Sequence, residues 1–159
     1  MDVCACINTA EKNKDYLTWK NIHPHAFLSY FFLSEDFGQV GFYDEKIDKV
    51  FSLKLDATMN VVSSWEDEVF CDPEKKIEPL VLDSVTLSVT AIKEAATLFF
   101  SEKYKTLQLV KMLYLLEKMP GFGVVWNITF VTTSFLLIII KLDPRTGKLL
   151  DEQKTNLVK

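Results

Sequence analysis

Four side chains near the start of the chain are of types that bind transition metals. The two thiols occur as Cys4-x-Cys6, and the only two imidazoles occur as His23-x-His25. Zinc takes four sulfur or nitrogen ligands in a tetrahedral array, but structural sites usually separate paired cysteines by two to four residues. A one-residue gap sends the two side chains to opposite sides of a strand, or far apart around a helix. We therefore predict no metal site and no bound cofactor.

The residues needed for nucleophilic or acid–base catalysis are also poorly arranged. Cys71 stands beside Asp72 and near Glu68, and neighbouring carboxylates disfavour the reactive thiolate. Glu66 and Glu68 share one face of a strand and could form an acid–base couple, but they belong to a charge run typical of a solvated strand end. The five glycines form no phosphate-binding loop. The sequence predicts no catalytic residues, and we expect a protein that is not an enzyme.

The composition describes an acidic chain with ample material for a core. It has 159 residues, a formal net charge of −4 at pH 7, and 48% hydrophobic and 13% aromatic residues. The acidic balance argues against binding to nucleic acid, which needs clustered lysine and arginine. The most apolar stretch, Val124 to Ile140, is interrupted by Asn127 and by Thr132-Thr133-Ser134. It is too short and too interrupted for a spanning helix, so we expect no contact with a membrane.

The cysteines and the first residues bear on location and partners. Met1-Asp2-Val3-Cys4 lacks the charged and then apolar leader of an exported protein, which predicts a cytoplasmic location unless a leader was removed. Cys4, Cys6 and Cys71 cannot all pair within one chain, so free thiols are the simplest interpretation, although the sequence does not fix their redox state. The surplus of apolar residues indicates a protein partner or a homodimer.

One turn pattern occurs three times in the chain. An aspartate follows an apolar residue, and Asp, Asn or Gly stands four positions later, in the copies that open at Asp44, Asp56 and Asp143. Asp can bond a following backbone N–H, and Asp, Asn and Gly best tolerate a positive φ. Each copy is therefore predicted to be a hairpin turn. Two copies follow a Lys-Leu-Asp triplet, at 54–56 and 141–143, which indicates two related halves.

The hydrophobic pattern predicts helices and antiparallel strands in two successive runs. A helix is expected over residues 4–20, capped by Asn8 or Thr9, and a second one over 91–102, capped by Thr90. The expected strands cover residues 26–33, 39–43, 49–55, 61–65, 107–116, 124–131, 135–140 and 148–153.

Two of these expected strands need separate comment. The composition of segment 107–116 favours a helix, whereas its leucines share the parity of a strand, and we predict a strand. The uninterrupted apolar run 135–140 predicts a central strand covered on both faces.

The clearest boundary in the chain is the charged segment between Asp72 and Pro79. We predict an N-terminal unit over 1–72, a linker over 73–79 and a C-terminal unit over 80–159. The predicted fold class is α+β, with two helix-plus-antiparallel-sheet units packed into one compact protein. The matching triplets and the similar positions of the expected helices predict an internal duplication.

Two segments together resemble the end of a PepSY-like domain. The first is Trp126-Asn127-Ile128-Thr129-Phe130, and the second is the run Ile-Ile-Ile-Lys-Leu-Asp-Pro-Arg-Thr-Gly-Lys-Leu-Leu at 138–150. In that family a short helix precedes antiparallel strands, and the last hairpin carries an Asp-x-x-Thr-Gly turn. Residues 41–69 resemble a degenerate second copy, in which Met59-Asn60 replaces Thr-Gly. The whole chain is similar to uncharacterised tandem PepSY-like proteins of archaea and bacteria.

The resemblance implies a non-catalytic module that binds or inhibits peptidases or other proteins, commonly outside the cytoplasm. We accordingly predict a protein- or peptide-binding module with an inhibitory or regulatory role, acting through a concave sheet or an edge strand. The apolar density of the last hairpin predicts a binding surface at Trp126, Phe130, Phe135 and Leu150. The alternative is a small-molecule-binding or hydrolytic α+β protein, with a pocket between helix and sheet lined by Phe99, Phe100 and Trp126.

Overall fold

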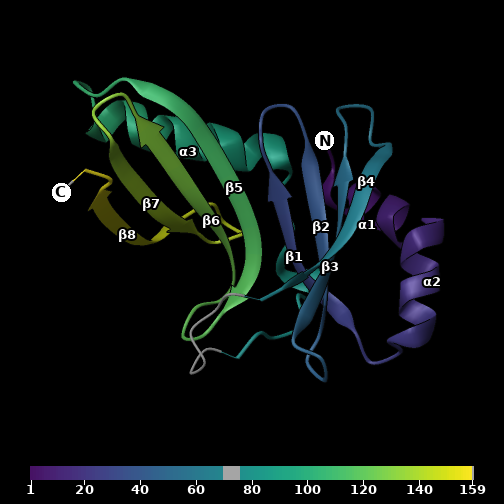
Figure 1. Ribbon diagram of the computed structural model, residues 1–159. Coiled ribbons are helices and arrows are strands. Elements are labelled where there is room, and N and C mark those ends of the chain that lie inside the picture. The colour runs from purple at the N-terminus through teal and green to yellow at the C-terminus, as the bar shows by residue number, and fades with distance from the viewer. Residues whose placement is uncertain (70–75, 159) are drawn as a thin grey trace.

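The computed structural model describes residues 1–69 and 76–158, which form an α+β fold (Figure 1). The helices of this part are α1 (Val3–Glu11), α2 (Lys14–Ile22) and α3 (Val89–Lys103), with a short 3-10 helix at Leu82–Ser84. The strands are β1 (Phe27–Leu33), β2 (Gly38–Asp44), β3 (Lys49–Leu55), β4 (Val61–Glu68), β5 (Leu109–Met119), β6 (Gly123–Thr132), β7 (Leu136–Leu142) and β8 (Leu149–Asn156). The strand predicted at 107–116 is confirmed as β5.

All eight strands belong to one antiparallel sheet in the order β4-β3-β2-β1-β5-β6-β7-β8. Each half of the chain is thus a helical segment followed by a four-stranded meander. The first strands of the two meanders, β1 and β5, pair antiparallel and form a seam in the middle of the sheet. At the seam Tyr30 lies opposite Glu117, and Phe32 lies opposite Leu115. The predicted linker over 73–79 lies partly outside the described residues.

The three helices lie on one face of the sheet; in Figure 1, α3 passes behind β5 and β6, and α1 and α2 stand at the right, next to β4. α1 contacts β2 and α2 contacts β3, while Phe100 of α3 stacks on Phe130 of β6 with ring centroids 5.0 Å apart. Burial of large apolar side chains on this face drives the packing. Each buried side chain stabilises the fold by roughly 1.5–3 kcal/mol, because its apolar surface is removed from water. The opposite face of the sheet carries no helix among the described elements.

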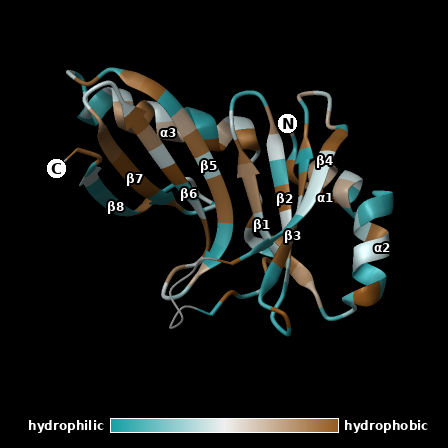
Figure 2. Ribbon diagram, in the orientation of Figure 1, coloured by the Kyte–Doolittle hydropathy of each residue, from teal (hydrophilic) through white to brown (hydrophobic). Residues whose placement is uncertain are grey.

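The apolar run of β7 is not central, which corrects the sequence-based expectation. β7 is the last strand but one, between β6 and the edge strand β8. Ile138 and Ile140 are buried on the helix-covered face, whereas Leu137 and Ile139 point to the open face and are half-buried. Figure 2 shows the resulting hydrophobic stretches along β6 and β7. A continuous apolar run can therefore belong to a strand with one covered and one partly open face.

The helix boundaries differ from the prediction because short polar side chains cap other positions. The expected helix over 4–20 is two helices, since the Asn13 Oδ1 accepts hydrogen bonds from the N–H groups of Asp15 and Tyr16 and starts α2 afresh. Asp2, not Asn8 or Thr9, caps α1. Ser88 caps α3 through the N–H of Ala91, so Thr90 lies inside that helix.

The three predicted turns are hairpin turns in which the aspartate accepts backbone hydrogen bonds. Asp44 accepts from the N–H of residue 46, Asp56 from residues 58 and 60, and Asp143 from residues 145 and 146. Positive φ occurs at Asp48 and Gly147 as predicted, but at Met59 rather than Asn60. The second turn is one residue shorter, because the N–H of Asp56 bonds the carbonyl of Asn60. The left-handed residue consequently comes one position earlier.

Candidate functional site

The four residues predicted to form a binding surface do not lie together on the surface, which corrects that prediction. Trp126 and Phe130 are 1% and 0% exposed and point into the core. Phe135 and Leu150 are 59% and 43% exposed. Side chains alternate between the two faces of a strand. The alternating apolar residues of β6, Trp126 and Phe130 among them, therefore all point to the face that the helices cover.

The space that the alternative function assigned to a ligand is filled by packed aromatic rings. Phe99 and Phe100 stack on Phe130, with ring centroids 6.4 Å and 5.0 Å away. Trp126 meets the edge of Phe31 at 6.2 Å. These residues therefore build the core between α3 and the sheet.

Of the imidazole and thiol groups near the start of the chain, His23 and Cys6 are held within the fold. In residues 1–69 and 76–158, no cluster of three or more His, Cys, Asp or Glu is placed to hold a metal ion. His23 Nδ1 lies 2.9 Å from Asp44 Oδ2, and the His23 ring packs on Trp19. Cys4 is exposed and Cys6 is buried, and burial raises the pKa of the Cys6 thiol to about 11. Cys71 lies outside the described residues.

Of the paired carboxylates, Glu66 is held by contacts with α2 and β3. Trp19 Nε1 donates to Glu66 Oε2 at 2.7 Å, and Lys49 Nζ lies 3.4 Å from Glu66 Oε1. The hydrogen bond from Trp19, helped by Lys49, lowers the pKa of the Glu66 carboxyl. Glu66 therefore fastens α2 and β3 to the edge strand β4.

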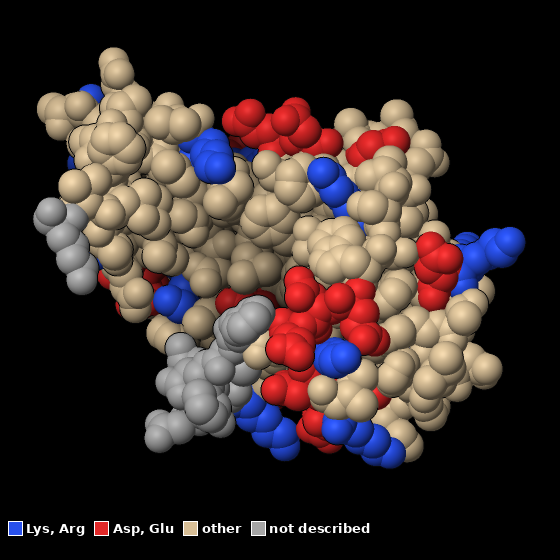
Figure 3. Space-filling model, viewed as in Figure 1, with Lys and Arg blue, Asp and Glu red and all other residues tan. Residues whose placement is uncertain are grey.

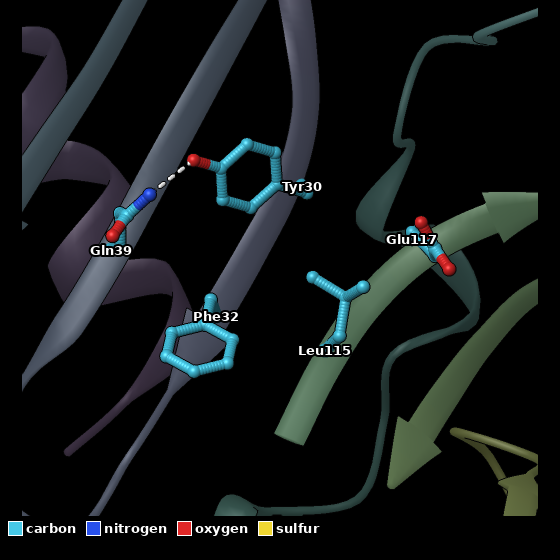
Figure 4. Close-up of a pocket in the computed structure, with 5 residues that line it drawn as sticks. All are labelled: Tyr30, Phe32, Gln39, Leu115 and Glu117. Carbon is cyan, nitrogen blue, oxygen red and sulfur yellow. Dashed lines mark hydrogen bonds between the residues drawn. The ribbon is translucent and has the colours of Figure 1, made fainter. Parts of the chain in front are cut away.

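The open face of the sheet is hollowed along the seam between β1 and β5 (Figure 3). This hollow has a volume of about 350 Å³ and is lined by Tyr30, Phe32, Gln39, Leu115 and Glu117. Figure 4 shows that the aromatic rings come from β1, while Leu115 and Glu117 face them from β5. Both halves of the chain thus contribute to one site.

The Tyr30 ring lies flat across the open face, and Gly41 makes room for it. A Cβ atom at position 41 would lie 2.0 Å from Tyr30 Cε1, which no side chain tolerates. Lying over β2 in this way, Tyr30 Oη accepts a hydrogen bond from Gln39 Nε2 at 2.5 Å and lies 2.8 Å from Ser52 Oγ on β3. These contacts hold the ring in one orientation as a wall of the hollow.

A second hollow of about 270 Å³ continues the first along the seam. Its lining includes Tyr43 and Val50 from the first meander and Ile77 from the segment before α3. Tyr30 and Glu117 line both hollows, so the two form one groove. We call it the seam groove.

The aromatic end of the seam groove is supported by a further ring and a cation. Phe32 packs on Phe37 with ring centroids 5.8 Å apart, and Lys54 Nζ lies 4.3 Å above the Phe37 ring. An ammonium over an aromatic face is attracted by the negative face of the ring. The contact fixes the hairpin that borders the groove.

Sequence reasoning missed the seam groove, because its walls meet only through the pairing of β1 with β5. Two local signals were available. Gly41 stands inside a strand, which often marks a close approach of another group. Tyr30 and Phe32 share the face opposite to the buried Phe31.

Comparison with family models and with curated proteins finds no match. Among solved structures, a candidate lipoprotein of Clostridium difficile is similar over 89% of this chain and 90% of its own, with 19% sequence identity and a TM-score of 0.58. A DUF2874 family protein from Bacteroides uniformis is 12% identical over 90% of this chain and 88% of its own, with a TM-score of 0.33. The first similarity shows that this chain and the Clostridium difficile protein share a fold.

No helix in the described part of the chain has the length and apolar character needed to cross a bilayer.

Proposed function

We propose that this chain is a non-catalytic module that binds a segment of another protein in the seam groove, in an inhibitory or regulatory role. One observation carries the proposal: the sheet face that no described helix covers has an apolar groove at its centre, and the walls of that groove are preorganised. Contiguous exposed apolar surface on a soluble protein commonly marks a binding site. Groups already fixed in place lose little entropy when a partner binds.

The shape of the seam groove favours a protein segment as the occupant. It is a shallow trough on a sheet, made of two connected hollows that each suit a side chain. Tyr30 offers a large, hydrogen-bonded ring, and rigid aromatic side chains are typical anchors at protein interfaces. The core between α3 and the sheet is filled, so the open face is where a partner would gain most contact area.

Selection of peptides tests this proposal. A phage library of random twelve-residue peptides is panned against the wild type, the Leu115→Asp variant and the Leu98→Asp variant. Leu98 is an exposed leucine of α3 and provides the matched control. We expect enriched peptides from the wild type and from Leu98→Asp, but none from Leu115→Asp, with circular dichroism showing all three folded. No enrichment from the wild type, or equal binding by Leu115→Asp, would contradict the proposal.

We further propose that the two halves are copies of one PepSY-like unit. The supporting observations are the repeated order of helical segment and meander, and the Lys-Leu-Asp triplets that end β3 and β7 at equivalent places. The exchange of residues 56–60 for residues 143–148 tests the equivalence. A folded chimera with cooperative unfolding is expected, and an unfolded one would argue against it.

The cytoplasmic location and the homodimer remain predictions. Cell fractionation and light scattering across protein concentration measure them.

A further inference from the structure

We propose that the chain also docks on an anionic lipid surface, through one end of the second half of the sheet. Four exposed apolar residues form this end, which we call the apolar tip: Leu109, Val110, Phe135 and Leu157. The inference is independent of the proposed function, because the tip and the seam groove are different surfaces. The sequence predicted no membrane contact because no segment could span a bilayer. Contact at the surface of a bilayer needs only an exposed apolar patch and suitable charge.

Backbone pairing brings the residues of the apolar tip to the same end of the sheet. β5 starts opposite the last residue of β6, and the N–H of Thr133 donates to the carbonyl of Gln108 at 3.0 Å. After the turn between β6 and β7, the N–H of Leu157 donates to the carbonyl of Phe135 at 2.9 Å. The four side chains are 38–59% exposed. Single exposed apolar residues are ordinary, but several at one end of a sheet mark an interaction site.

Phe135 gives separate evidence that the apolar tip has a role. It stands in the turn between β6 and β7 with φ 61, and its side chain is 59% exposed. Glycine or asparagine adopts this conformation with little strain, whereas a bulky side chain rarely does. Because the ring is mostly exposed, packing within the fold does little to offset the strain. Strained residues of this kind concentrate at functional sites.

The charges around the apolar tip have the sign that an anionic surface attracts. Segments 102–111 and 152–158 border the tip and contain six charged residues: Lys103, Lys105, Lys111, Lys154, Glu102 and Glu152. Four lysines against two glutamates give this end a net charge of +2, whereas the whole chain carries −4. In the face drawn in Figure 3, the upper-left corner, where β5 begins and β6 ends, shows uncharged and basic side chains and no acidic ones.

Two of these lysines are available to a partner. Lys103 Nζ lies 2.5 Å from Glu152 Oε2, so those two charges offset each other. Lys105 and Lys111 are exposed, and neither takes part in an ion pair with a described residue. Both lie within four residues of Leu109, so their positive charge stands directly beside apolar surface.

A bilayer that contains anionic lipids matches both parts of this surface. Apolar side chains that enter the boundary between headgroups and acyl chains leave water, as the apolar faces of interfacial helices do. Lysine stems lie along apolar material while their ammonium groups reach phosphates, and each lysine near an anionic leaflet adds attraction. The chemistry that the apolar tip recognises is therefore a lipid headgroup layer of negative charge.

Docking through the apolar tip leaves the seam groove accessible. Leu115 of the groove lies six residues beyond Leu109 on the same strand, and six residues of a strand span about 20 Å. The membrane surface and a bound protein segment would thus meet different parts of the sheet.

Binding to vesicles tests the apolar part of this inference. The vesicles contain phosphatidylcholine alone, or phosphatidylcholine with phosphatidylserine, and bound protein is measured by flotation. Phe135→Ser/Leu157→Ser is compared with the control Leu17→Ser/Ile22→Ser, whose two side chains are exposed on α2. We expect the wild type and the control to bind the phosphatidylserine vesicles. The partition coefficient of the tip variant should be about tenfold lower, with circular dichroism showing all three folded.

A second pair of variants tests the charge. Lys105→Gln/Lys111→Gln is compared with Lys12→Gln/Lys14→Gln, in which two exposed lysines of the first half are replaced. The former should bind phosphatidylserine vesicles about tenfold more weakly, and the latter should bind like the wild type. Added salt should weaken binding of the wild type, because it screens exposed charges.

Hydrogen–deuterium exchange in the presence of the phosphatidylserine vesicles locates the contact. Slower exchange is expected at the start of β5, in the turn between β6 and β7 and after β8, with β1 and β2 unchanged. Protection of β1 and β2 instead would overturn the inference.

Three further results would also overturn it. They are a wild type that does not bind phosphatidylserine vesicles, a wild type that binds phosphatidylcholine vesicles equally well, and tip variants that bind like their controls. If the wild type does not bind vesicles and light scattering shows a dimer that Phe135→Ser/Leu157→Ser abolishes, a second copy of the chain covers the tip. None of these results affects the peptide selection that tests the seam groove.

Discussion

The two halves of the sheet share a frame but differ on the open face. The last two residues of β3 and the next residue are Lys54-Leu55-Asp56, and those of β7 are Lys141-Leu142-Asp143. In each half the triplet lysine lies over the phenylalanine that precedes the first glycine of the second strand, 4.3 Å from Phe37 and 5.3 Å from Phe122. Turn aspartates and strand-end lysines thus set the same outline twice.

The open face differs between the halves. In the first half Tyr30 lies across Gly41 and presents its ring to the groove. In the second half β5 and β6 are longer, with 11 and 10 residues against seven each in β1 and β2. Leu115 and Glu117 come from this longer hairpin. The turn aspartates and strand-end lysines that occur in both halves hold the sheet together, while the groove arises where the two unlike halves meet.

Separate unfolding of the two halves would show that they do not share one core. Phe42 in β2 and Phe130 in β6 are buried on the helix-covered face, 1% and 0% exposed. Phe42→Ala and Phe130→Ala should each lower the free energy of unfolding by about 3–5 kcal/mol, because each leaves a large cavity. Since β1 and β5 pair directly, urea unfolding followed by circular dichroism should show one transition in both variants. Two transitions, only one of which moves, would contradict a common core.

The position of the Tyr30 ring over Gly41 is a feature of the first half. It can be tested by filling the space that the ring occupies. Gly41→Ala puts a Cβ 2.0 Å from the Tyr30 ring, so the ring must move. We expect a loss of about 1–3 kcal/mol in the free energy of unfolding, typical of overpacking. The double variant Gly41→Ala/Tyr30→Ala should recover part of the Gly41→Ala cost, measured in a double-mutant cycle. Additive losses would show that the ring does not need the glycine.

Asp44 opens a turn whose contact with His23 has no counterpart at Asp143, because both histidines of the chain lie in the first half. Burial opposes ionisation of its carboxyl, but hydrogen bonds from the Lys46 N–H and from His23 outweigh burial and lower its pKa. A lowered pKa stabilises the fold above the unfolded value of about 3.9, and this stabilisation is lost as the pH falls through the folded value. Asp44→Asn should therefore cost about 1.5 kcal/mol at pH 6, and this cost should diminish as the pH falls through the folded pKa of Asp44. Denaturation across pH measures this, and a cost that persists in acid would refute it.

The smallest effects are expected at two turns of the second half. Each turn has one residue with a positive φ, a glycine in one and a phenylalanine in the other. Gly147 has φ +73, and the exposed Phe135 has φ 61, a conformation that costs a side chain about 1 kcal/mol. Gly147→Ala should lower the free energy of unfolding by about 1 kcal/mol, and Phe135→Gly should raise it by a similar amount. Thermal unfolding gives the two signs. Destabilisation by Phe135→Gly would mean that its ring makes contacts worth more than the strain.

Local chemistry predicted the strands and turns well. Period-two alternation located β3 and β6, and the aspartate turns located three hairpins. These features depend on residues close in the chain. Asn13 and Ser88, which start α2 and α3, were missed because several polar residues near each helix start could serve as a cap.

The sheet order and the candidate site were beyond local reasoning. The placement of β7 beside the edge, and the pairing of β1 with β5, depend on contacts between distant segments. The same holds for Trp126, whose parity showed one buried face without showing which face the helices cover. Leu115 became a site residue only because Phe32 lies opposite.

Hydrogen–deuterium exchange of the wild type, with and without a selected peptide, tests the central claim most directly. Binding in the seam groove predicts slower exchange in β1, β2 and β5, and unchanged exchange in α1 and α3. Protection confined to the helices, or to the edge strand β8, would contradict it.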